Sequence, residues 1–345
     1  MLTELHTTES EATTREAVNR AVSTLHAGEP VALPTETVYG LAADALNETA
    51  VKRVFEAKER PSFDPLIVHV PDKKSIRDVA EIPDDLDKIV TQLVETFWPG
   101  PLTIVLPKKP HIPDEVTAGL PTVGVRMSNH PIFGKVIKAF GGPLAAPSAN
   151  RFGRVSPTSA AAVMDELDGR IPLVIDGGAC ARGIESTIVA LEENEPKPLI
   201  RILRLGPVTA DDLKKFGKID KSRRNEAVEE NAPEAPGMLA SHYAPNTPLR
   251  MPESAAEFVP EPGKRYALLS YRGQEKDGFL DLVDWEEIAI LSPGSGRLPE
   301  AGIRLYHVLR QLDQLGVDEI IAEPFPDRGV GSAILDRLKK AASIR

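Results

Sequence analysis

The sequence predicts an α/β protein with two domains. Its 345 residues suffice for about two domains of roughly 150 residues each. Short apolar runs with strand character alternate with segments of helical periodicity along most of the chain. A polar, aperiodic stretch at residues 217–240 interrupts this alternation. We therefore expect a first domain over residues 1–210, a linker over residues 211–245 and a second domain over residues 246–345.

Helices and strands are mixed throughout the first domain. Apolar residues at helical spacing, or a glycine or proline that ends a segment, predict helices at residues 15–27, 48–59, 84–97 and 160–167. Short apolar runs predict strands between them, at residues 30–34, 66–70, 102–106, 123–127, 144–146, 173–176 and 187–191. This mixture predicts one α/β domain.

The second domain repeats the alternation on a smaller scale. Strands are expected at residues 266–271, 288–291 and 318–322, and helices at residues 300–315 and 332–342. Strands that alternate with helices favour a small parallel, Rossmann-like sheet. No dinucleotide-binding motif accompanies it, because Gly329-Val330-Gly331 lacks the third glycine.

The composition suits a cytoplasmic enzyme without a membrane partner, which is the default class, and it suits a binding protein equally well. The formal charge of −10 argues against a protein that binds nucleic acid over its whole surface. A single cysteine excludes an internal disulfide and a cysteine-based zinc site. The polar N-terminus is unlike a secretory signal, and no apolar run approaches the roughly 18 residues that span a bilayer.

Two cations end the predicted helix at residues 48–59. Lys58 lies four residues after Val54 and seven after Val51, so it continues the apolar face of that helix. A lysine in this position must reach a partner or extend to solvent. Together with Arg60 it suits a polyphosphate, because each cation neutralises a different oxygen. The alternative is that both residues cap the helix C-terminus, where the dipole favours cations.

Other segments place hydrogen-bonding residues at strand ends. The apolar run 144–147 leads into Ser148 and Asn150, a spacing that suits a ligand at a sheet edge but also a plain turn. Ser186 stands at a strand entrance, after glycines that allow main-chain amides to approach a ligand. Arg126 lies in an alternating strand, where it either faces a buried carboxylate or phosphate or lies on an exposed edge.

The sequence offers no covalent catalyst. It lacks a Walker A motif and the Gly-x-Ser-x-Gly motif that presents a nucleophilic serine. Cys180 has no histidine nearby in the sequence, and a lone cysteine is more often inert than catalytic. None of these patterns therefore identifies an enzyme nucleophile.

Six motifs follow one another in an order that resembles the Sua5/YrdC family of threonylcarbamoyl-AMP synthases. They read PTETVYGL at residues 34–41, KxRP at 58–61, PLIVH at 65–69, WPGPLT at 98–103, APSAN at 146–150 and ESTI at 185–188. The segment HYAP at 242–245 and the second domain make the chain similar to the long Sua5 form. The resemblance implies a twisted, mixed-sheet YrdC-like domain around a positively charged hollow, followed by a smaller Rossmann-like α/β domain.

The resemblance implies an ATP-dependent reaction. L-threonine, bicarbonate and ATP would give L-threonylcarbamoyladenylate and pyrophosphate. The product would serve the t6A modification of adenosine 37 in tRNAs that read ANN codons, through a separate threonylcarbamoyl-transfer machinery. Mg²⁺ is expected to accompany ATP on its phosphates, without a metal site in the protein.

The resemblance also assigns residues to each substrate. The expected ATP-binding residues are Lys58, Arg60, Thr122, Ser148, Asn150, Ser156, Arg204, His242 and Tyr243. The expected threonine-binding residues are Thr37, His69, Arg126, Ala146 and Ser186. One position departs from the family, because Asp64 stands where Asn or Lys often occurs. An anion there is unfavourable beside a triphosphate unless it meets Mg²⁺ or points away.

The end of the linker suits a lid. An imidazole and an aromatic ring, His242 and Tyr243, follow a polar tether. Tyr243 would then cover the adenine or ribose, and His242 would meet a phosphate. The alternative is that Tyr243 only anchors the second domain.

Two other functions compete with the synthase. An RNA-binding module without catalysis would use the hollow as a cradle for double-stranded RNA, but the acidic charge argues against it. Direct binding of tRNA is left open by the sequence. The hydrogenase-maturation carbamoyltransferase contains a related domain, but it needs cysteine-rich zinc fingers that one cysteine cannot build.

Overall fold

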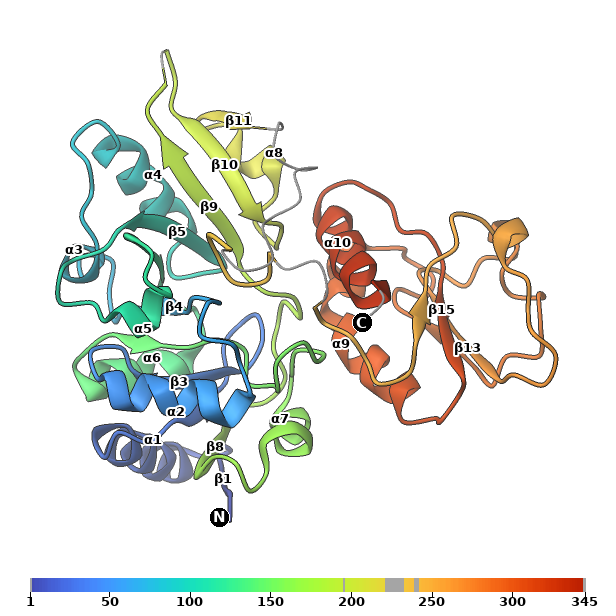
Figure 1. Ribbon diagram of the computed structural model, residues 1–345, viewed down its shortest axis with the longest axis horizontal. Coiled ribbons are helices and arrows are strands. Elements are labelled where there is room, and N and C mark those ends of the chain that lie inside the picture. The colour runs from blue at the N-terminus through green and yellow to red at the C-terminus, as the bar shows by residue number, and fades with distance from the viewer. Residues whose placement is uncertain (1, 195, 221–232, 239–241, 344–345) are drawn as a thin grey trace.

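The structure of the chain, a computed structural model, describes residues 2–194, 196–220, 233–238 and 242–343. These residues form two sheets, each with its own helices (Figure 1). The larger sheet is mixed and the smaller one is parallel. The predicted α/β fold class is therefore confirmed.

The larger sheet is built from strands that are distant in sequence. Its strands are β1 (Glu4–Thr7), β2 (Val31–Leu33), β3 (Gly40–Asp44), β4 (Ile67–His69), β5 (Leu102–Pro107), β6 (Thr122–Arg126), β7 (Leu144–Ala145), β8 (Leu173–Asp176), β9 (Thr187–Glu192), β10 (Leu199–Arg204) and β11 (Lys218–Asp220). Their spatial order is β1-β8-β2-β3-β7-β4-β6-β5-β9-β10-β11. Strand β4 runs parallel to β6, and β7 runs antiparallel to both β3 and β4. This order brings the separate sequence motifs to one region.

Helices of different lengths pack around the larger sheet. They are α1 (Glu11–His26), α2 (Glu48–Lys58), α3 (Ile76–Val79), α4 (Asp87–Phe97), α5 (Asp114–Thr117), α6 (Pro131–Phe140), α7 (Ala160–Leu167) and α8 (Ala210–Leu213). The Asn47 side chain accepts hydrogen bonds from the amides of Thr49 and Ala50 at the start of α2. Helix α2 therefore begins at a fixed point and delivers Lys58 at its last position.

The smaller sheet carries its two long helices on the side of the larger domain. It contains β12 (Leu249–Arg250), β13 (Tyr266–Ser270), β14 (Glu287–Ile290) and β15 (Glu319–Ala322), in the order β12-β15-β13-β14. All of its pairs are parallel, as the sequence predicts. Helices α9 (Leu298–Asp313) and α10 (Val330–Ala342) lie between this sheet and the larger domain (Figure 1).

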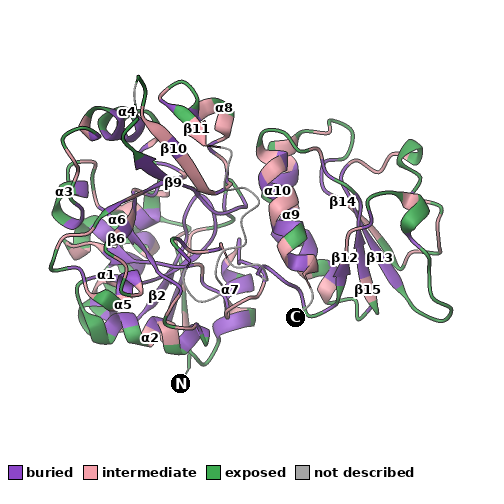
Figure 2. Ribbon diagram, turned by 45° about the horizontal axis from the view of Figure 1, so that its top comes forward, coloured by how far each residue is buried: buried purple, intermediate pink, exposed green. Residues whose placement is uncertain are grey.

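The two domains share an apolar cluster. Val38, Val155 and Ile184 of the first domain belong to the same buried cluster as Leu305 and Ile334 of α9 and α10. Figure 2 shows buried residues along α9 and α10 where they face the larger domain. The second domain is thus packed against the first through apolar residues of α9 and α10.

The structure differs from the sequence prediction in the linker. Helix α8 overlaps the start of the range predicted as linker, and strand β11 lies inside that range and pairs parallel with β10. Residues 218–220 therefore extend the larger sheet instead of leaving it. Residues 221–232 and 239–241 of the predicted linker lie outside the described residues. Within the described part of the chain, no helix is both long and apolar enough to cross a bilayer.

Candidate active site

Strand ends and the loops after them surround one small cavity in the larger domain. Strand β4 contributes His69, β6 contributes Arg126 and β10 contributes Arg204, each at its last residue. The full lining is Thr37, Val38, Arg60, Ile67, His69, Arg126, Ala146, Pro147, Ser148, Glu185, Arg204, Pro236, Gly237, His242 and Tyr243. The free volume is about 40 Å³, which is room for only a few water molecules.

Arg126 is held by a buried carboxylate at one side of the cavity. Its Nη2 donates to Oε1 of Glu36 at 2.7 Å and to Oγ1 of Thr37 at 3.0 Å. Burial alone would raise the pKa of Glu36, but Arg126 and the Ser128 hydroxyl hold it below its usual value. The Nε of Arg126 is buried and has no hydrogen-bond partner among the described residues. Of the two orientations that the strand pattern leaves open, the structure shows the inward one, and one donor of Arg126 is still available.

His69 presents a neutral imidazole to the same side of the cavity. Burial, with a further contribution from the charge of Arg126, lowers its pKa from 6.5 to about 3. The ring packs against Phe133 at 4.7 Å between centroids. Its Nδ1 is buried without a hydrogen-bond partner among the described residues. His69 can therefore exchange a hydrogen bond with a ligand without adding charge.

Lys58 binds the loop that carries Ser148 and Asn150. Its Nζ donates to the main-chain oxygens of Ser148 at 2.6 Å and of Asn150 at 2.5 Å. The side chain of Lys58 is almost fully buried, and this desolvation lowers its pKa well below the usual value. Capping of its own helix does not explain the residue, because its partners lie about 90 positions further along the chain.

Arg60 and Asp64 form a buried pair beside Lys58. Arg60 donates from Nε to the main-chain oxygen of Asp64 and from Nη2 to that of Pro65. Its Nη2 also lies 2.9 Å from Oδ2 of Asp64. Asp64 has no exposed surface, and neither of its carboxylate oxygens has a well-aligned hydrogen bond in the described residues. The anion that departs from the family pattern therefore lies among the cations and does not point away from them.

Arg204 connects two further elements at the cavity. It donates from Nε and Nη2 to the main-chain oxygen and Oγ of Ser186, each at 3.0 Å. Its Nη1 donates to the main-chain oxygen of Pro236 at 3.1 Å. The Ser186 hydroxyl also lies 2.8 Å from Oγ1 of Thr103 on β5. The cation is thus fixed between β9 and the segment 233–238.

Ser156 lies behind the cavity wall and binds Glu185, which lines the cavity. The Ser156 hydroxyl donates to Oε1 of Glu185 at 2.6 Å, and both residues are buried. Glu185 also accepts hydrogen bonds from Tyr306 of α9 and Arg337 of α10. Burial alone would raise the pKa of Glu185, but the charges of Arg337 and Arg204 lower it to about 2. The second domain therefore reaches the wall of the site.

His242 and Tyr243 close the cavity on the side of the second domain. Their rings lie 4.1 Å apart between centroids, and Tyr243 adopts a left-handed φ of 64°. A Cβ at Gly237, which has a φ of 79°, would lie 2.4 Å from the Tyr243 hydroxyl. Glycine is therefore required where the segment 233–238 passes this ring.

The predicted site residues are brought together with one exception. Thr37, Arg60, His69, Arg126, Ala146, Ser148, Arg204, His242 and Tyr243 line the cavity. Lys58, Asn150, Ser156 and Ser186 lie directly behind it through the contacts of Ser148, Glu185 and Arg204. Thr122, at the start of β6, lines a neighbouring hollow instead.

Sequence reasoning missed the residues that hold the predicted ones in place. Glu36 and Glu185 lie inside quoted motifs, yet no local pattern names their partners. Arg337 and Tyr306 come from the second domain, 152 and 121 positions from Glu185. Arg337 is fully buried on the apolar face of α10. An arginine on the apolar face of a helix is the one sequence feature that could have pointed to this residue.

The site can position and neutralise anions, and the one thiol of the chain, which does not line the cavity, is unsuited to attack. Lys58, Arg60, Arg126 and Arg204 are all buried around one cavity. Burial raises the pKa of the Cys180 thiol to about 12, so it is protonated near neutral pH. In the described part of the chain, no group of three or more His, Cys, Asp or Glu side chains could hold a metal ion.

Two family models match the chain and together span most of it. The model described as "Telomere recombination", for Sua5, YciO and YrdC, matches residues 23–206. The model described as "Threonylcarbamoyl-AMP synthase, C-terminal domain" matches residues 208–343. A Bacillus subtilis (strain 168) protein named threonylcarbamoyl-AMP synthase is 40% identical, over 95% of this chain and 93% of its own. A Pyrococcus abyssi protein of the same name is 38% identical, over 94% of each chain.

Solved structures agree with these matches. The P. abyssi Sua5 complexed with L-threonine superimposes with a TM-score of 0.83 at 36% identity, over 99% of this chain and 98% of its own. A doubly substituted variant of that protein gives a TM-score of 0.84 at 35% identity, over 99% and 96% of the two chains. The chain therefore belongs to the Sua5/YrdC family of threonylcarbamoyl-AMP synthases, in the long form with a second domain.

Proposed function

We propose that the chain makes L-threonylcarbamoyladenylate from L-threonine, bicarbonate and ATP, with release of pyrophosphate. The observation that carries the proposal is the gathering of Lys58, Arg60, Arg126 and Arg204 around one small cavity. Each of these cations already has main-chain or carboxylate partners that fix its position. Fixed charges stabilise a reacting polyphosphate without reorganising during the step.

The proposed reaction needs no enzyme nucleophile. The threonine amine takes up the carbon of bicarbonate, which forms a carbamate and releases water. A carbamate oxygen then attacks the α-phosphorus of ATP, and the bond to the β-phosphate oxygen breaks. Pyrophosphate leaves with its electron pair. The chain contributes orientation and charge neutralisation, in keeping with a buried, protonated Cys180.

The nucleotide end of the site would comprise the predicted ATP-binding residues. We propose that the triphosphate lies against Lys58, Arg60 and Arg204, with hydrogen bonds from the residues of the loop after β7 and from Ser156. ATP enters as its Mg²⁺ complex, so the metal belongs to the substrate and is ligated mainly by phosphate oxygens. Thr122 would contact ATP only if the nucleotide extends into the neighbouring hollow.

The threonine end would lie beside β4 and β6. We propose that the free Nε of Arg126 binds the threonine carboxylate, and that Thr37, His69, Ala146 and Ser186 surround the rest of the molecule. The complex of the P. abyssi relative with L-threonine supports this ligand. A neutral His69 suits a place next to an amine that must lose its proton before it reacts.

Admission of ATP would require the described linker residues to move. A free volume of about 40 Å³ is far too small for a nucleotide. Pro236, Gly237, His242 and Tyr243 are the lining residues that come from the predicted linker. We propose that they withdraw to admit ATP and then cover it. The packing of Tyr243 on the second domain also supports an anchoring role, and both roles are compatible.

We further propose that the chain acts in the cytoplasm and passes its product to separate transfer machinery. That machinery would attach the threonylcarbamoyl group to adenosine 37 of tRNAs that read ANN codons. The proposal rests on the family and on the proposed product.

One assay tests the proposal. Purified chain is incubated with MgATP, L-threonine and ¹³C-bicarbonate, and pyrophosphate and the adenylate are measured, the latter by mass spectrometry. We expect pyrophosphate release that needs all three substrates, and an adenylate that carries the heavy carbon. Pyrophosphate release independent of threonine, or none at all, contradicts the proposal. Salt-sensitive binding of double-stranded RNA without any adenylate would favour the RNA-binding alternative.

A further inference from the structure

Two residues of the second domain donate hydrogen bonds to Glu185. Tyr306 of α9 donates from its hydroxyl to Oε2 of Glu185 at 2.9 Å, and Arg337 of α10 donates from Nε to the same oxygen at 2.9 Å. The other carboxylate oxygen accepts the Ser156 hydroxyl at 2.6 Å. Glu185 also lines the cavity. A carboxylate of the catalytic domain is thus saturated by donors from three separate parts of the chain.

Arg337 connects this carboxylate to the residues that close the cavity. Its guanidinium lies 4.9 Å from the centroid of the Tyr243 ring, and its Nη2 donates to the main-chain oxygen of Leu205 at 2.8 Å. Tyr243 also stacks on Tyr306 at 5.9 Å. The contacts of Arg337 and Tyr306 therefore support Tyr243 in its strained, left-handed conformation.

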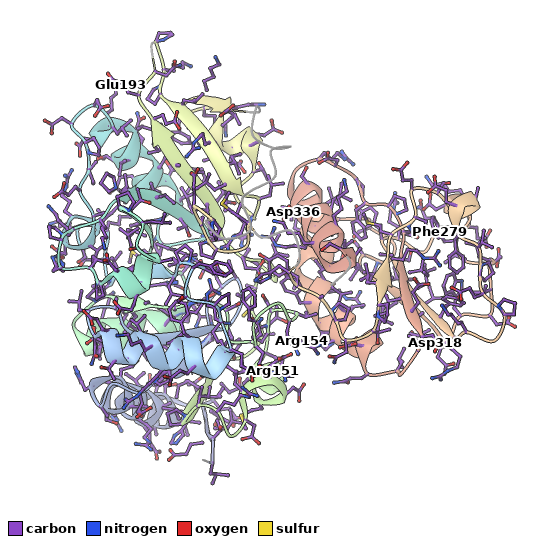
Figure 3. The ribbon with its side chains drawn as sticks, viewed as in Figure 1. Arg151, Arg154, Glu193, Phe279, Asp318 and Asp336 are labelled. Atoms are coloured by element: carbon purple, nitrogen blue, oxygen red, sulfur yellow. The ribbon has the colours of Figure 1, made fainter. Side chains whose placement is uncertain are left out.

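Helix α10 also holds the main chain at two positions that precede Tyr243. Lys340 donates from Nζ to the main-chain oxygen of Gly237 at 2.7 Å, and its own main-chain oxygen accepts the amide of His242 at 3.4 Å. Asp336, labelled on α10 in Figure 3, accepts hydrogen bonds from both Arg337 and Lys340. One helix of the second domain thus binds the main chain of Gly237 and of His242, which both line the cavity.

The backbone contact between the domains is close at this point. A Cβ on Gly183, two residues before Glu185, would lie 2.4 Å from the main-chain oxygen of Gly302 on α9. Ile184 packs in the shared apolar cluster with Leu305 and Tyr306. The segment that carries Glu185 and Ser186 therefore takes its position directly from α9.

We propose that the second domain completes the ATP site, with Arg337 as a positioning residue that acts through Glu185, Ser156 and Tyr243. An unheld Glu185 would be an anion at the wall of a triphosphate site, and it would be free to turn into the cavity. Arg337 and Tyr306 occupy its lone pairs and keep it on the Ser156 side. This inference rests on the proposed function for the identity of the nucleotide.

The test compares full-length variants by two measurements. The variants are Arg337→Met, Arg337→Lys and Tyr306→Phe, with Arg310→Met as the matched control. Arg310 of α9 also crosses the domain interface, to Glu166 and to the main-chain oxygen of Val155, but it does not bind Glu185. The measurements are the KM values for ATP and threonine from pyrophosphate release, and the Kd for MgATP by calorimetry without threonine.

We expect Arg337→Met to raise both KM and Kd for ATP by about tenfold or more, with the threonine KM within about twofold of the parent value. Arg337→Lys should recover part of the loss, because lysine keeps the charge but cannot bind Glu185 and Leu205 together. Tyr306→Phe should raise the same constants by about three- to tenfold, and Arg310→Met by less than about twofold.

Unchanged ATP constants in folded Arg337→Met and Tyr306→Phe would overturn the inference. Equal losses for ATP and threonine in every variant, including Arg310→Met, would also overturn it, because they would reflect domain docking alone. If Arg337→Met fails to fold, the loss of one hydroxyl in Tyr306→Phe decides the question. A parent chain that binds MgATP but makes no adenylate would defeat the proposed function, and the Kd values would still test Arg337. A parent chain that binds no MgATP would defeat both.

Discussion

Lys58 and Ser148, ninety positions apart in the sequence, are joined by a hydrogen bond of 2.6 Å from the lysine Nζ to the serine main-chain oxygen. The same Nζ binds the main-chain oxygen of Asn150. The last residue of α2 therefore sets the conformation of the loop after β7. A lysine that the sequence pattern offers as a phosphate ligand also shapes the loop that would bind that phosphate.

Lys58→Ala should reduce adenylate formation by about a hundredfold or more. The variant loses a buried cation and leaves two main-chain oxygens without their donor, and the loss of one partner of a desolvated polar pair costs about 2–5 kcal/mol. Pyrophosphate release measures the effect, and circular dichroism checks the fold. Lys52→Ala is the matched control, because Lys52 lies on the exposed face of the same helix. Near-parental turnover in a folded Lys58→Ala would show that the loop holds its shape without the lysine.

Arg126→Lys should raise the KM for threonine by about tenfold or more and leave that for ATP within about twofold. Lysine can keep the ion pair with Glu36, but it cannot also offer a second, coplanar donor to a carboxylate. Steady-state kinetics with each substrate varied in turn measure the split. Arg77→Lys, in an exposed pair with Asp87, is the control. Equal increases in both KM values would assign Arg126 to the nucleotide or to the fold.

Asp64→Asn should tighten ATP binding by about three- to tenfold. Asp64 is a buried anion beside Arg60, and like charges brought together across a site oppose binding. The amide removes the charge at almost constant volume. Calorimetric titration with MgATP measures the affinity, and activity is followed against Mg²⁺ concentration. A weaker affinity, with a raised Mg²⁺ requirement, would instead make Asp64 a ligand of the metal carried by ATP.

The free energy of unfolding should fall as the pH drops below 6.5, and His69 should contribute to the slope. Burial lowers the pKa of His69 to about 3, so between 6.5 and 3 the unfolded chain binds a proton that the folded chain does not. The stability present above pH 6.5 is therefore lost on acidification, by about 1.4 kcal/mol per pH unit for this group. Burial also lowers the pKa of His242, which adds a slope of the same sign.

Urea unfolding at pH 7 and pH 5 measures this slope. His69→Gln should reduce the difference between the two pH values by about 2 kcal/mol. His111→Gln changes an exposed histidine and should leave the difference as it is. If the free energy of unfolding of His69→Gln differs between pH 7 and pH 5 by as much as that of the parent, the His69 ring does not stay neutral in the folded chain.

The sequence is informative about the fold where one element carries its own signal. Helix α4 has an apolar stripe at helical spacing and lies at Asp87–Phe97, inside the predicted range 84–97. Strand β1 has no such signal, because its one large apolar residue, Leu5, is exposed and the strand depends on pairing with β8. Helix α6 was also missed, although Pro131 at its start and Gly141 at its end are recognisable helix limits.

For the site, too, the sequence is informative only about residues that carry a local signal. Motifs name the residues of one strand end or loop, and the cavity brings most of them together. The partners of those residues come from pairings that local sequence does not encode. Glu36 holds Arg126 across 90 positions, and Arg337 holds Glu185 across 152. Thr122 was assigned by the family resemblance, but its place at the start of β6 puts it beside a different hollow.

The small free volume of the cavity also has a consequence for the lifetime of what is made there. A carbamoyl adenylate is a mixed anhydride, and water competes with any other acceptor for its reactive carbon. The cavity has about 40 Å³ of free space. If it opens only enough to hold its ligands, little bulk water can lie beside that carbon. The chain would then protect the adenylate as well as make it, and the adenylate would be hydrolysed by water mainly after its release from the site.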